Sequence, residues 1–121
     1  MNRVAIVSAK RTAIGSFGGS LKDISAAKIG GELVKQALED INLNPNLVDE
    51  IIFGNVLQTG LGQNVARQIA VNAGIPKEKS AFVVNKVCGS GLKSVVLGVQ
   101  SIMLGDNDIV VCGGVENMSA A

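Results

Sequence analysis

The chain has 121 residues, with eleven Lys and Arg side chains against ten Asp and Glu, so its formal net charge is +1. This length is ordinary for one domain with a core of its own. The charge is nearly balanced and three Phe are the whole aromatic content, which argues against the basic, base-stacking surface of a nucleic-acid-binding protein. Two cysteines are too few for a disulfide framework, and we expect both to stay reduced in the cytoplasm.

The first apolar run of the chain is short. Val4 to Val7 is followed at once by polar and basic residues, so the run cannot form a signal-peptide core or a membrane span. We therefore expect no membrane partner. The run predicts a first β-strand from Arg3 to Ser8, and the glycines from Gly15 to Gly19 predict the loop after it.

Strands and helices then alternate, because short apolar runs repeatedly give way to helical spacing. The order predicts a βαβαβαβ unit of the α/β class. Its further elements are expected in this order: a helix from the N-cap Ser25 to Ile41, a strand from Glu50 to Phe53, a helix from Asn64 to Ala73, a strand from Ala81 to Val84, a helix that follows Cys88 and ends near Leu104, and a strand from Ile109 to Cys112.

The last three strands are continuously apolar, which is typical of strands buried on both faces of a parallel sheet. Three helices cannot fully shield both faces of a four-stranded sheet. The sequence therefore predicts that other material packs against this unit. No internal repeat or linker divides it.

Cys88 is the candidate nucleophile. It lies between an apolar strand and a helical pattern, so its thiol is expected just before or within the first helical turn, where free N–H groups and the helix dipole favour a thiolate. A neighbouring base normally completes such a site, yet the chain contains no histidine.

Residues 84 to 92, Val-Asn-Lys-Val-Cys-Gly-Ser-Gly-Leu, resemble the acyl-enzyme cysteine signature of the thiolases, the acetyl-CoA acetyltransferase family. Residues 11–18, 60–68 and 113–119 resemble other family segments in the same order and spacing. Because thiolase subunits are much longer, the resemblance implies that residues 1–121 are the N-terminal part of a thiolase N-terminal domain, without the loop domain and the C-terminal half. It implies a thiolase-like fold with a mostly parallel sheet flanked by helices.

The resemblance also implies a function. Two acetyl-CoA molecules would condense to acetoacetyl-CoA, or a 3-ketoacyl-CoA would be cleaved by thiolysis, through an acyl thioester on Cys88. In the family, a histidine and a second cysteine of the C-terminal half supply the acid–base chemistry, so this chain alone would lack the full catalytic set. Coenzyme A thioesters would be substrates, and we expect no cofactor or metal site. A homodimer or homotetramer is implied as well.

Two alternatives stay open. A condensing enzyme of the ketoacyl synthase type would share the fold and the nucleophile, although Cys-Gly-Ser-Gly from Cys88 favours a thiolase. The other alternative is a catalytically incomplete fragment or one subunit of a split thiolase.

Other candidate residues have structural interpretations. Cys112 ends a strand and is expected to be buried and unreactive. Glu116 is interpreted as an anchor for the loop after the last strand rather than as a base. Gly89 and Gly91 would leave room for an acyl group and for close packing.

The segment between the second strand and the second helix carries weaker signals. Gly60-Leu61-Gly62 lacks the third glycine and the acidic residue of a dinucleotide loop, so that function is disfavoured. Arg67 and Gln68 would either contact a partner subunit or face solvent.

Overall fold

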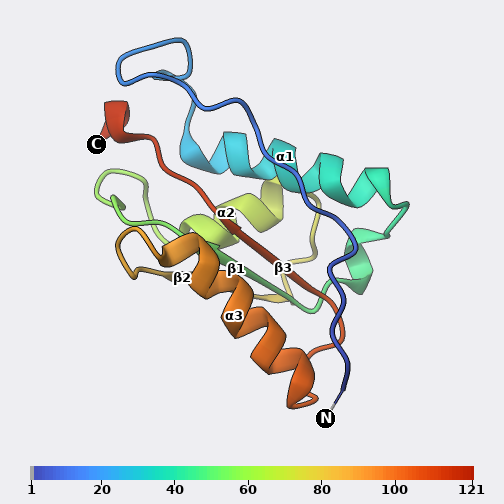
Figure 1. The fold of residues 1–121 in the computed structure, drawn as a ribbon. Coiled ribbons are helices and arrows are strands. Elements are labelled where there is room, and N and C mark those ends of the chain that lie inside the picture. The colour runs from blue at the N-terminus through green and yellow to red at the C-terminus, as the bar shows by residue number, and fades with distance from the viewer. Residues whose placement is uncertain (1) are drawn as a thin grey trace.

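A three-stranded parallel sheet lies at the centre of the structure, a computed structural model that describes residues 2–121 (Figure 1). Its strands are β1 (Glu50–Gly54), β2 (Ser80–Val84) and β3 (Val110–Gly114), in the order β2-β1-β3. The register pairs Gly54 with Val84 on one side and with Gly114 on the other. The carboxyl ends of all three strands therefore meet at one edge of the sheet.

Helices cover both faces of this sheet, which confirms the predicted α/β class (Figure 1). Helix α2 (Val65–Asn72) packs on β1 and β2, and α1 (Ala26–Asp40) packs on α2. Helix α3 (Ser90–Met103) contacts β1 and β3 from the opposite face. Two short 3-10 helices, η1 (Pro45–Leu47) and η2 (Met118–Ala120), lie in the connecting segments. The predicted helices and the last three predicted strands all form, with ends shifted by at most two residues.

Side chains at the helix ends explain these boundaries. Ser25 caps α1 by accepting a hydrogen bond from the Lys28 N–H at 3.1 Å. Asn64 has a left-handed backbone with φ of 48°, and its side-chain oxygen accepts from the first turn of α2. Gly105, with φ of 84°, follows the C-cap of α3 and allows the chain to turn back toward β3.

The core lies mainly between the sheet and α2. Successive side chains of a strand point to opposite faces, so Ile51 and Phe53 of β1 pack toward Val65 and Ile69 of α2. Burial on both faces holds only for the central strand β1, since β2 and β3 are half-buried and Phe82 of β2 is 37% exposed. Within the described residues the prediction of two buried faces was wrong for β2 and β3, because α3 hardly covers β2 and α2 does not cover β3.

The predicted first strand, Arg3 to Ser8, does not form in the structure. This segment is irregular and crosses from α3 to α1, held by hydrogen bonds of Asn2 to the Ile102 carbonyl and of Ser8 to the Ala37 carbonyl. A cavity of about 470 Å³ lies between the segment and β3. Ile6 is left 77% exposed. The apolar run favours extended backbone, but a strand also needs a hydrogen-bonding partner, and the cavity separates the run from β3.

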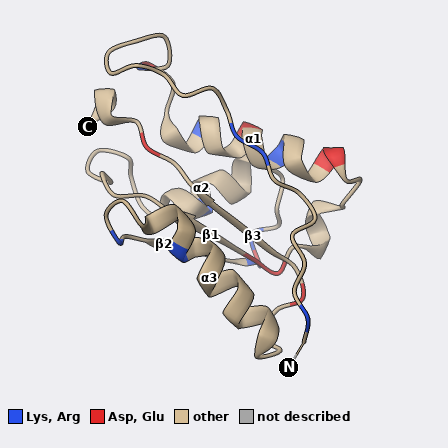
Figure 2. Ribbon diagram, in the orientation of Figure 1, with Lys and Arg blue, Asp and Glu red and all other residues tan. Residues whose placement is uncertain are grey.

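Positions of Lys and Arg alternate along the chain with positions of Asp and Glu, without a long run of one sign (Figure 2). None of the described helices is long and apolar enough to cross a membrane.

Candidate active site

The candidate site lies where the start of α3 meets the carboxyl ends of β1 and β3. Cys88 is in the turn between β2 and α3, directly before the N-cap residue Gly89, as the sequence predicts. The helix start approaches the sheet closely, because a Cβ on Gly54 would lie 2.5 Å from the Ser90 carbonyl carbon. Sequence reasoning missed Gly54, whose only signal is a glycine at the end of an apolar strand.

The glycines beside Cys88 are less constrained by packing. A Cβ on Gly91 would meet only the Gly114 Cα, at an ordinary 3.9 Å, and a Cβ on Gly89 would lie 3.4 Å from the Lys86 carbonyl oxygen. Close packing at this helix start therefore depends on Gly54 more than on Gly89 or Gly91.

The turn that carries Cys88 has an unusual backbone. Val87 has φ of 49°, a left-handed conformation that is costly for a β-branched residue. Its N–H donates to the Asn85 side-chain oxygen at 3.0 Å, and its carbonyl accepts from the Ser90 hydroxyl at 2.7 Å. Side chains on either side of Val87 thus hold both polar groups of this residue.

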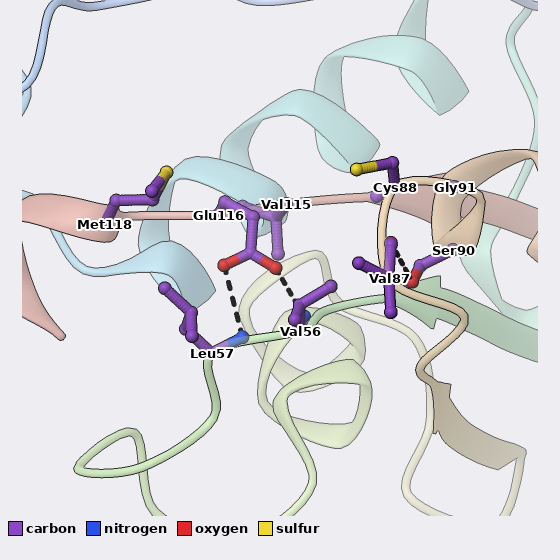
Figure 3. Close-up of a pocket in the computed structure, with 11 residues that line it drawn as sticks. Val56, Leu57, Val87, Cys88, Ser90, Gly91, Val115, Glu116 and Met118 are labelled. Carbon is purple, nitrogen blue, oxygen red and sulfur yellow. Dashed lines mark hydrogen bonds between the residues drawn. The ribbon is translucent and has the colours of Figure 1, made fainter.

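The thiol of Cys88 is exposed and borders an open cavity of about 550 Å³. Val56, Leu57 and Met118 supply much of its apolar lining. In Figure 3 the Cys88 and Met118 side chains point toward each other above Glu116. The site therefore offers a thiol at a helix start beside an apolar wall.

Glu116 also borders this cavity, but its carboxylate is engaged elsewhere. It accepts hydrogen bonds from the backbone N–H groups of Val56 and Leu57, the latter at 3.3 Å, and points away from Cys88 toward that loop (Figure 3). Glu116 thus ties the segment after β3 to the segment after β1, which confirms its interpretation as an anchor.

Cys112 differs sharply from Cys88. It is half-buried on β3 beneath α3, where a Cβ on Gly98 would lie 2.4 Å from its sulfur. Burial raises the pKa of the Cys112 thiol to about 11. The expectation that Cys112 is a packing residue with little thiolate agrees with this environment.

Arg67 and Gln68 do not simply face solvent, because both side chains hydrogen-bond to loops of their own chain, and contact with a partner subunit stays a prediction. Arg67 donates to the Lys79 carbonyl at 2.5 Å, and Gln68 donates to the Leu61 and Gln63 carbonyls at 2.8 and 3.0 Å. Both side chains are half-buried and hold loops of their own chain. The Gln68 amide fills the turn around Gly62, whose carbonyls face inward, so this loop is not shaped as a phosphate cradle.

Metal chemistry has no support among the described residues. No group of three or more His, Cys, Asp and Glu side chains in residues 2–121 could hold an ion.

Comparison with known proteins decides the family. The model of the family described as "Thiolase, N-terminal domain" matches residues 4–121. The chain belongs to the thiolase family. The resemblance carried by the segment around Cys88 is thereby confirmed, and a thiolase is favoured over the related ketoacyl synthase type.

Individual thiolases are similar over nearly the whole chain. A probable acetyl-CoA acyltransferase of Staphylococcus aureus (strain NCTC 8325 / PS 47) is 54% identical over 119 residues, which cover 98% of this chain. An acetyl-CoA acetyltransferase of Syntrophomonas wolfei is 53% identical over 118 residues. The crystal structure of Acat5 thiolase from Ascaris suum in complex with coenzyme A has a TM-score of 0.92, with 44% identity over 94% of this chain. The chain spans 30% of the length of each of these proteins.

Proposed function

We propose that this thiolase chain carries the acyl-accepting nucleophile of an acetyl-CoA acyltransferase, and that Cys88 is that nucleophile. The observation that carries the proposal is the exposed Cys88 thiol beside an open cavity at the start of α3. Backbone N–H groups at a helix start favour negative charge beside them, which suits a site where an oxyanion develops. Coenzyme A in the similar Ascaris suum thiolase supports a coenzyme A thioester as the substrate.

The first half-reaction is acyl transfer to sulfur. The Cys88 thiolate attacks the thioester carbonyl carbon, a new C–S bond forms, and the bond to the coenzyme A sulfur breaks. Coenzyme A leaves as a thiolate and takes up a proton. The backbone N–H of Cys88 is suited to donate to the developing oxyanion, because backbone amides at a helix start are fixed donors.

The second half-reaction forms the carbon–carbon bond. A second acetyl-CoA loses its α-proton, and the carbanion attacks the acyl-Cys88 carbonyl. Acetoacetyl-CoA forms, and the Cys88 thiolate leaves. Thiolysis of a 3-ketoacyl-CoA is the reverse sequence. By the resemblance to thiolases, a second cysteine of the C-terminal half takes this α-proton.

The organisation of the complete enzyme is part of the proposal. Residues 1–121 form the N-terminal part of the thiolase N-terminal domain, and a loop domain and a C-terminal half supply the remaining catalytic groups. The 30% coverage of the similar thiolases supports this arrangement. A cytoplasmic homodimer or homotetramer without further cofactors is the expected form, and a reducing compartment keeps Cys88 free.

The test is a thiolysis assay with acetoacetyl-CoA and coenzyme A on the full-length polypeptide that contains these residues. Cys88→Ala should abolish turnover, and Cys112→Ala should retain it. Turnover by the Cys88→Ala variant, or no turnover by the unchanged protein, would contradict the proposal.

A further inference from the structure

We propose that Ser90 is a positioning residue that latches the turn bearing Cys88 in its reactive conformation. The inference rests on the proposed role of Cys88 as the acyl acceptor. It goes further by assigning a task to a side chain that does not itself react.

The Ser90 hydroxyl forms two hydrogen bonds with the turn before it. It accepts a hydrogen bond from the Lys86 N–H at 2.7 Å and donates one to the Val87 carbonyl at 2.7 Å. A hydroxyl has one proton to donate and lone pairs to accept, so this pair of bonds uses it both as donor and as acceptor. Ser90 is only 4% exposed, so water competes little for either bond.

The Ser90 hydrogen bonds maintain a backbone conformation that a β-branched residue such as Val87 disfavours. Val87 has φ of 49°, and a β-branched side chain in this region is strained unless its surroundings hold it. The Val87 carbonyl also accepts from the Ser90 N–H at 3.2 Å. Ser90 therefore holds the Val87 carbonyl with two donors, while the exposed Asn85 side chain holds the Val87 N–H with one acceptor.

The position of Cys88 depends directly on this strained residue. Relaxation of Val87 to an ordinary backbone conformation would rotate the peptide between Val87 and Cys88 and move the thiol and its N–H together. Ser90 itself is the first residue of α3, and its main chain is packed against Gly54, so the latch is fixed to the sheet. Because α3 is fixed against the sheet, the hydrogen bonds of the Ser90 hydroxyl fix the turn that carries Cys88 relative to the sheet.

The experiment measures the rate of Cys88 alkylation by iodoacetamide near neutral pH in the full-length polypeptide, by peptide mapping. This readout does not require thiolase turnover, so it can fail independently of the proposed function. Ser90→Ala should slow Cys88 alkylation by about 5- to 30-fold, and kcat for thiolysis should fall with little change in KM. Ser90→Thr, which keeps the hydroxyl, should recover most of the rate.

Two further variants separate positioning from general loss of stability. Ser101 lies on the same helix and donates to the Gly98 carbonyl at 2.8 Å, far along the chain from Cys88. Ser101→Ala should lower the thermal midpoint by an amount similar to Ser90→Ala and leave Cys88 alkylation unchanged. In a Val87→Gly background the left-handed conformation is no longer strained, so Ser90→Ala should slow alkylation by less than about threefold.

Two outcomes would contradict the proposed positioning role of Ser90. One is that Ser90→Ala slows Cys88 alkylation by the same factor whether or not the Val87→Gly substitution is present. The other is a Ser90→Ala variant that alkylates and turns over as fast as the unchanged protein.

Discussion

Gly54→Ala should displace the turn that carries Cys88 without touching Cys88 itself. The new Cβ would lie 2.5 Å from the Ser90 carbonyl carbon and 2.7 Å from the Gly91 nitrogen. Both are backbone atoms of a helix start, so no side chain can rotate away. Ordinary van der Waals contact between such atoms begins near 3.4 Å, so the start of α3 would have to move away from the sheet by about 1 Å.

Such overpacking costs about 1–3 kcal/mol of stability. A misplacement of about 1 Å at a reacting group can lower a rate by about 100-fold. We therefore expect Gly54→Ala in the full-length polypeptide to lower the thermal midpoint and to reduce the rate of acyl transfer to Cys88 by one to two orders of magnitude. Thermal unfolding and transfer of a radiolabelled acetyl group from acetyl-CoA measure the two effects.

Gly91→Ala is the matched control for stability. It adds a methyl group to the other side of the same contact, where the nearest atom is the Gly114 Cα at 3.9 Å. Its thermal midpoint should be unchanged or higher, since alanine is favoured over glycine in helices by about 1 kcal/mol. A Gly54→Ala variant as stable and as fast in acyl transfer as the unchanged protein would refute the reasoning.

Further predictions concern the two cysteines, one carboxylate and the isolated chain. Iodoacetamide should label Cys88 much faster than Cys112 at pH 8, because a pKa raised by burial to about 11 leaves about one Cys112 thiol in a thousand ionised; equal labelling on peptide mapping would contradict this. The Ile109 and Asp108 N–H groups lower the pKa of Asp49, so this carboxylate stabilises the fold above the ordinary Asp pKa and the stabilisation is lost as pH falls through the lowered value. Asp49→Asn should therefore reduce the loss of folding stability at acidic pH, measured by circular dichroism at a series of pH values. An unchanged loss of stability would show that Asp49 does not cause it. Residues 1–121 expressed alone should show no acetoacetyl-CoA thiolysis above the uncatalysed rate, since they contain no histidine base.

The sequence predicted those parts of the fold that local patterns determine. Caps such as Ser25 and breakers such as Gly105 gave the helix ends, and continuous apolar runs gave β1, β2 and β3. The run from Arg3 to Ser8 has the same local pattern but no strand partner in the structure. Pairing depends on what lies beside a segment, which a local pattern does not contain.

The sequence predicted the candidate nucleophile but not the residues that position it. The motif located Cys88, because its neighbours mark a helix start. Gly54 and Ser90 escaped sequence reasoning, since their importance arises from contacts across the fold or from a single hydroxyl geometry. The hydrogen bonds of Arg67 and Gln68 to loops of their own chain were missed for a related reason, because their acceptors are backbone carbonyls that composition does not show.

The acyl-enzyme itself tests the central claim most directly. The full-length polypeptide would be mixed with acetyl-CoA, quenched in acid and mapped by peptide mass spectrometry. We predict one acetyl group on the peptide containing Cys88, and its removal when coenzyme A is added before the quench. An acetyl group on Cys112 or on another residue, with the Cys88 peptide unmodified, would contradict the assignment of Cys88 as the nucleophile.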